Sequence, residues 1–125
     1  MKRTTARELA FKTIYAKFFN AEANEEVDLE QADRDGLEFT SKILKSFASN
    51  YQEINEILSR NLKGYTVERL YKVDLAIITL AIIELKFINE NPKEVIINEA
   101  VELAKKYSTE KSPRFINGVL ADIVK

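Results

Sequence analysis

One long apolar stretch constrains the fold of this chain more than any other feature. From Thr66 to about Asn89 the chain, taken as a helix, is apolar almost all round. A helix that is hydrophobic on almost every face has to be surrounded by other elements. The polar residues form only a narrow stripe, made of Glu68, Lys72, Thr79 and Lys86. The stretch is therefore expected to be the central helix of a bundle.

The same stretch is too short to cross a membrane. Its most apolar part, Val73 to Ile88, contains three charged residues, whereas a spanning helix needs about 20 predominantly apolar residues. The N-terminal segment has basic residues, but charges also interrupt its apolar positions, so it lacks a signal-peptide core. We therefore expect no membrane association and a cytoplasmic, bacterial-type protein.

Helical periodicity covers most of the remaining chain. Thr5 with Glu8 has the pattern of a capping box, and Ser112 with Pro113 has the pattern of a helix N-cap followed by N1. The acidic segment from Ala21 to Asp35 is expected to be a solvated connection. The other expected helices cover residues 5–20, 37–47, 50–62, 93–107 and 112–125. Together these patterns predict an all-α fold, a compact single-domain helical bundle of about six to seven helices spanning residues 1–125.

Composition excludes most familiar active sites. The chain contains no cysteine and no histidine, so it lacks thiolate ligands, disulfides and the commonest acid–base group at neutral pH. A carboxylate-bridged metal bundle would need a Glu-x-x-His motif, which is also missing. We expect no catalytic residue, no metal and no cofactor.

Charge is distributed unevenly along a chain whose net charge is only −1. Residues 1–17 carry five positive charges and one negative, residues 18–38 carry one and eight, and residues 105–125 carry five and two. The two chain ends are thus the basic parts. Because non-specific nucleic-acid binding scales with the number of phosphates neutralised, a sequence pI near 5.6 allows only local, modest binding of this kind.

The last expected helix, "SPRFINGVLADIVK", contains an interior glycine, which costs about 1 kcal/mol relative to alanine. One interpretation is structural: Gly118 lets a neighbouring backbone approach closely and Phe115 belongs to the core. The other interpretation is functional: the helix start attracts phosphate, Lys111 and Arg114 add charge, and Phe115 stacks a base. The two interpretations are compatible.

Three motifs resemble the family of the bacterial transcription antitermination factor NusB. "EVIINEAVELAKKYSTEKSPRFINGVL" is similar to its C-terminal signature, "ARELAFKTIYA" to its first helix and "VDLAIITLAIIEL" to its central helix. The resemblance spans nearly the whole chain. It implies an all-helical RNA-binding protein, not an enzyme, that binds single-stranded boxA RNA with NusE, a small-subunit ribosomal protein. The resulting complex supports read-through by RNA polymerase, chiefly in ribosomal RNA operons.

The resemblance also implies site residues. The RNA surface would comprise Lys2, Arg3, Arg7, Lys111, Ser112, Arg114 and Phe115, and Glu84 matches a position linked to NusE binding. Arg7 lies nearer the core side of its helix than Arg3, so a structural ion pair is an equal alternative. An internal salt bridge is likewise the alternative for Glu84, because a charge in an apolar helix is paired or lies at an interface. Asp74, near the helix start, is interpreted as structural.

Some features depart from the family, and rival functions exist. Thr79 stands where the family usually has an arginine, and the N-terminal arm has fewer arginines than in many members, which affects the expected RNA affinity. A NusB-like domain also precedes an RNA cytosine methyltransferase, but that enzyme needs a glycine-rich cofactor domain and a nucleophilic cysteine. A helical protein–protein adaptor without RNA binding is the other alternative, and it would have neutral chain ends.

Overall fold

The structure, a computed structural model, describes residues 3–19 and 34–125. Within these residues the chain forms helices and no strand, which confirms the predicted all-α bundle. Most of the acidic segment from Ala21 to Asp35 lies outside the described residues. The elements are α1 (Arg3–Lys17), α2 (Arg34–Ser49), α3 (Tyr51–Asn61), η1 (Val67–Arg69), α4 (Lys72–Ile83), η2 (Glu84–Ile88), α5 (Lys93–Tyr107) and α6 (Ser112–Ile123).

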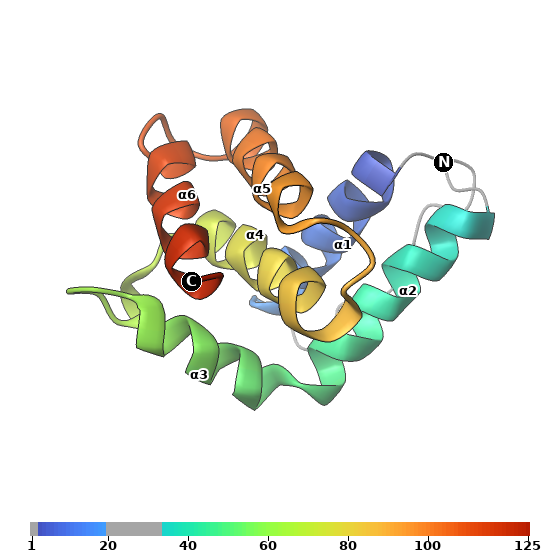
Figure 1. The fold of residues 1–125 in the computed structure, drawn as a ribbon, viewed down its shortest axis with the longest axis horizontal. Coiled ribbons are helices and arrows are strands. Elements are labelled where there is room, and N and C mark those ends of the chain that lie inside the picture. The colour runs from blue at the N-terminus through green and yellow to red at the C-terminus, as the bar shows by residue number, and fades with distance from the viewer. Residues whose placement is uncertain (1–2, 20–33) are drawn as a thin grey trace.

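Helix α4 lies at the centre of the bundle (Figure 1). All of its residues from Val73 to Ile83 are buried, and it packs against each of the other five α-helices. The predicted central helix is therefore confirmed. Thr79, which was expected on a polar stripe, is also buried, at 3% exposure. The stripe fails there because neighbouring helices cover every side of α4.

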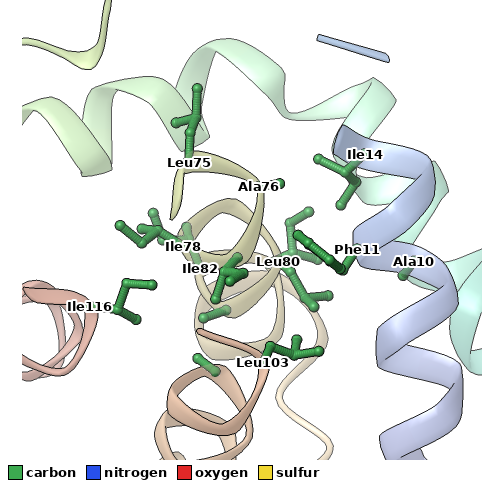
Figure 2. Close-up of a cluster of buried hydrophobic side chains, with 14 of the residues drawn as sticks. Ala10, Phe11, Ile14, Leu75, Ala76, Ile78, Leu80, Ile82, Leu103 and Ile116 are labelled. Atoms are coloured by element: carbon green, nitrogen blue, oxygen red, sulfur yellow. The ribbon is translucent and has the colours of Figure 1, made fainter. Parts of the chain in front are cut away.

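The core joins residues from the whole length of the chain (Figure 2). Ala10, Phe11 and Ile14 of α1 face the central helix, as do Leu103 of α5 and Ile116 of α6. Complete burial of an aliphatic or aromatic side chain contributes roughly 1.5–3 kcal/mol, so α4 is stabilised by contacts on all sides. This packing fixes where the ends of α1, α4 and α6 lie relative to one another.

The N-terminal part of the predicted central helix is not continuous with α4. Residues Val67–Arg69 form the 3₁₀ turn η1, and Leu70 and Tyr71 are extended, with ψ of 141° and 131°. This break buries Leu70, at 6% exposure, and leaves the Tyr71 ring 54% exposed. Periodicity did not indicate the break, because apolar residues continue on both sides of it.

The C-terminal end of the central helix widens into the π-helical turn η2, which Asn89 ends in the left-handed region at φ 53°. Two expected caps also differ. Thr5 lies inside α1, since that helix begins by Arg3, and Ser112 is the first residue of α6, after Lys111. The one-residue shift at Ser112 is within the usual uncertainty of helix ends, whereas α1 begins at least two residues before Thr5.

Gly118 does not lie at a helix–helix contact. It is exposed on α6, and a Cβ atom placed on it would have no neighbouring atom within 4 Å. The expectation that this glycine allows a close backbone approach is therefore wrong for the described residues. Helix α6 packs through its other face, where Ile116, Val119 and Leu120 are buried.

Gly118→Ala should therefore stabilise the protein by about 1 kcal/mol, because alanine is the better helix former and meets no neighbour. The free energy of unfolding, from urea titration, tests this value. Gly64→Ala is the matched control: its site is equally open, but φ there is +80°, so the same change should destabilise. A loss of stability in Gly118→Ala would contradict the open geometry.

Candidate nucleic-acid interface

Arg3, at the start of α1, is partly exposed and already has partners. Its Nη2 atom donates to Glu90 Oε1 at 2.9 Å, and the guanidinium lies 4.4 Å from the centre of the Phe39 ring. Lys42 of α2 also binds Glu90, at 2.6 Å. The Arg3 side chain retains 44% exposure. One edge of this guanidinium is thus occupied while the group remains accessible to a ligand.

Arg7 and Glu84 form a buried ion pair between α1 and the end of α4. Arg7 Nε donates to Glu84 Oε2 at 2.8 Å, and Nη2 donates to Oε1 at 3.0 Å. The pair is bidentate, the geometry that makes arginine–carboxylate contacts strong and directional. Glu99 of α5 lies 3.7 Å from Arg7 Nη1. Both residues of the pair are 2% exposed.

This geometry corrects two expectations. Arg7 was placed on the RNA surface and Glu84 on the NusE surface, each with an internal ion pair as the alternative. Because both side chains are buried and engaged with each other, neither presents its charge to a ligand. The pair instead joins α1 to η2.

Ser112 is also buried, at 2% exposure, and forms the centre of a hydroxyl cluster at the start of α6. Its Oγ atom lies 2.8 Å from both Ser108 Oγ and Thr109 Oγ1 and accepts the Thr109 backbone N–H at 3.3 Å. Ser108 Oγ in turn donates to Asp74 Oδ1 at 2.5 Å. Asp74 is thus structural, as interpreted, and Ser112 positions the α5–α6 connection rather than facing solvent.

The exposed part of the predicted surface lies around the first turn of α6. Lys111 and Arg114 are exposed, and Phe115 is partly buried against the core. Phe115 also contacts an aromatic residue that sequence reasoning missed: the Tyr65 ring centroid lies 5.7 Å away at an interplanar angle of 67°. The segment "YTVERLY" contains two tyrosines and an arginine, a signal that was hidden by its interpretation as part of the central helix.

The structure separates the two basic ends of the chain. Arg3 binds Glu90 next to the first turn of α5, whereas Lys111 follows the last turn of that helix. Helix α5 has 15 residues, a length of about 22 Å. Arg3 and the start of α6 therefore do not form one compact site. Lys2 lies outside the described residues.

A third cluster joins α1 to the last turn of α5, between those two regions. Glu8 accepts hydrogen bonds from Tyr107 and, at 2.8 Å, from Lys106, and Lys12 lies 3.8 Å away. Burial would raise the pKa of Glu8, but the hydrogen bonds from Lys106 and Tyr107 outweigh it and keep that pKa below its usual value. The hydrogen bond from Lys42, followed by that from Arg3, likewise lowers the pKa of Glu90.

The part of the chain that the structure describes has neither a metal-binding cluster nor a membrane-spanning helix. No cluster of three or more metal-ligating side chains occurs there. None of the described helices has the length and apolarity to span a bilayer.

Fold and surface together define an all-α protein whose exposed cations and rings are suited to nucleic acid. The model of the NusB family matches residues 4–125, and the chain belongs to that family. The transcription antitermination protein NusB of Clostridium botulinum strain Kyoto is 39% identical over 99% of this chain and 100% of its own. NusB of Bacillus mycoides is 40% identical over 98% and 97%.

Solved structures agree with this assignment. NusB of T. maritima superposes with a TM-score of 0.91 at 32% identity, covering 98% of this chain and 90% of its own. A structure of antitermination factors NusB and NusE in complex with double-stranded RNA matches with a TM-score of 0.86 at 30% identity, covering 98% and 97%. The expected family membership is thus confirmed.

Removing one member of the Arg7–Glu84 pair should strongly destabilise the fold. Glu84→Leu leaves a buried arginine without its main partner, which costs about 3–5 kcal/mol, measured as the free energy of unfolding in urea. The double variant Arg7→Leu, Glu84→Leu should recover most of this loss. Glu102→Leu breaks an exposed pair with Lys105 and should change stability by less than about 1 kcal/mol. An equally small effect in Glu84→Leu would show that the pair is dispensable.

Stability should also fall in acid. Because Glu8 and Glu90 have folded pKa values below 4.5, their contribution is complete at pH values above 4.5 and is lost as pH falls through the lowered values. Unfolding free energies measured between neutral pH and pH 3 should show this decline. Glu8→Gln removes one of the two carboxylates, so its stability should depend less on pH over that acidic range. A variant with the parent's acid profile would mean that Glu8 does not contribute.

Proposed function

We propose that this chain is a transcription antitermination factor. It binds single-stranded boxA-type RNA of nascent ribosomal RNA transcripts together with NusE and supports read-through by RNA polymerase. Residues 1–125 act as a single NusB-like RNA-binding domain in the cytoplasm, and the role is regulatory rather than enzymatic. Family membership supports this function, because relatives along the full chain are named transcription antitermination proteins.

The single observation that carries the proposal is the surface at the start of α6. Lys111 and Arg114 are exposed on either side of the buried Ser112, and Phe115 lies on the next position with its ring partly accessible. A cation next to an accessible ring can bind a phosphate and stack the adjoining base, as single-stranded RNA requires. The N-terminal end of the 12-residue helix α6 adds a favourable dipole for phosphate.

Arg3 provides a second, weaker contact in this proposal. It lies about one α5 length from Lys111, with Lys12 and Lys106 near the last turn of α5 between them. A strand that reaches both regions follows α5 and α1 rather than wrapping one compact pocket. Lys2 is proposed to extend the contact beyond Arg3.

NusE is proposed to complete the RNA surface. Among the described residues, the proposed surface at the start of α6 offers only Lys111, Arg114 and Phe115, so selectivity for one RNA sequence requires contacts from a second protein. The similar structure that contains NusB, NusE and RNA supports an assembly of this composition. Glu84 is proposed to affect NusE binding through the position of α1, because its carboxylate is engaged with Arg7.

Arg114→Ala tests the RNA surface. With NusE present, affinity for a labelled boxA-type RNA should fall, and the slope of log K against log salt should shrink by about 0.7, the value for one phosphate on a single strand. Lys45→Ala is the matched control, because Lys45 is exposed on α2 and should leave both quantities unchanged.

The same titration distinguishes direct RNA binding from the alternative, a protein–protein adaptor. An adaptor without RNA contacts would bind NusE normally, and RNA would have the same affinity for the mixture as for NusE alone. That result, with the parent protein folded, would exclude direct RNA binding. A duplex of the same sequence, included as a third ligand, determines whether single strands are preferred.

A further inference from the structure

A small cavity beside the proposed RNA surface is lined in part by residues to which no role has been assigned, among them Arg69 and Tyr71. The α3–α4 connection passes α6 here (Figure 1). The cavity lined by these segments has a volume of about 210 Å³. Its lining comes from three separate segments of the chain: Tyr65, Arg69, Leu70, Tyr71, Asp74, Thr109, Lys111, Ser112 and Phe115. The break between η1 and α4 creates it, because a continuous helix would have directed Tyr71 elsewhere.

The rim and floor of the cavity differ in chemistry. Tyr65 and Tyr71 are 57% and 54% exposed, so the rim presents two aromatic rings to solvent, and Arg69 is also exposed. The floor contains Asp74 and Ser112, which are 7% and 2% exposed. These floor residues are fixed by the hydroxyl cluster with Ser108. The rim is therefore suited to stacking, and the floor is rigid and polar.

Aromatic side chains on the rim of the cavity are placed where they can stack on a flat ligand. The Tyr65 ring packs edge-on against Phe115, and Tyr65 remains 57% exposed, so it is accessible to a flat ligand. Tyr71, the residue directly before α4, also lines the cavity. The volume is below the roughly 300–1,000 Å³ of sites for drug-sized ligands, and a single planar ring system suits it better.

The charged residues around the cavity indicate which chemical groups are attached to the bound ring. Arg69 and Lys111 line the cavity, and Arg114 follows on the exposed face of α6, so cations lie beside the mouth. The single carboxylate in the lining, Asp74, is buried and already accepts a hydrogen bond from Ser108. A flat ring joined to an anionic backbone on both sides is a nucleotide within a strand.

We infer that this cavity holds one unpaired nucleobase of the bound RNA, stacked against Tyr71 and the Tyr65–Phe115 pair, with its flanking phosphates near Arg69, Lys111 and Arg114. The inference rests on the proposed function and extends it by assigning Tyr65, Arg69 and Tyr71. Stacking of a base on an aromatic residue does not depend strongly on base identity. A base in a duplex is paired and stacked, so only a single strand can supply it.

Substitution of Tyr71 tests the pocket. Tyr71→Leu keeps an apolar side chain but removes the stacking face, so affinity for boxA-type RNA in the presence of NusE should fall roughly 5- to 150-fold. Tyr71→Phe keeps the ring and should bind like the parent. Tyr51→Leu is the control, because Tyr51 is 46% exposed on α3. All variants should melt at the parent's temperature, since the altered rings are largely exposed.

A fluorescent base analogue locates the nucleotide. RNAs carrying 2-aminopurine at successive positions should show strong quenching at one position with the parent protein, and Tyr71→Leu should abolish it. Arg69→Ala should lower the salt slope by about 0.7 with quenching retained. These readouts distinguish a stacked base from a general loss of RNA affinity.

The outcomes separate the pocket from the function on which it rests. If the parent binds RNA, but Tyr65→Leu and Tyr71→Leu bind it equally well with unchanged quenching, the pocket assignment is overturned and the function stands. If the parent binds no RNA, both are overturned. Loss of NusE binding with RNA affinity intact would identify a protein ligand instead, and equal affinity for a duplex would exclude an unpaired base.

Discussion

Burial of α4 on every side is the constraint on which the rest of the structure depends. Its residues from Val73 to Ile83 are all buried, so five other α-helices have to surround it. The charged residues of this segment then lie only near its two ends. Asp74 at one end binds the serine cluster that opens α6, and Glu84 just past the other end binds Arg7 of α1. The central helix thus positions both basic regions through one carboxylate each.

A consequence of this arrangement is that charged residues divide into two kinds. Arg7, Glu84 and Asp74 are buried and fix helices in place, whereas Lys111, Arg114 and Arg69 are exposed next to aromatic rings. Only the second kind is available to a ligand. Resemblance to a family predicts a ligand-binding role for both kinds of residue. The reason is that the same motifs contain buried residues that position helices and exposed residues that contact a ligand.

The sequence predicts the bundle well and the surface only in part. A helix that is apolar on all faces has one physical solution, so the central position of α4 follows from residues 66–89 alone. Arg7 and Glu84 each had two interpretations, because the choice depends on a partner 77 residues away. The break at Leu70 and Tyr71 escaped detection, since it changes no hydrophobic period. The cavity beside α6 depends on that break and was therefore invisible to pattern reasoning.

The order in which the chain is synthesised has a bearing on how α1 docks. Thr40 can bind the Ala6 carbonyl early, but Glu84 follows Arg7 by 77 residues and Tyr107 follows Glu8 by 99. Contacts of such long range require closure of most of the chain and slow folding relative to locally connected bundles. On the ribosome, α1 therefore remains without these two partners until η2 and α5 have been made.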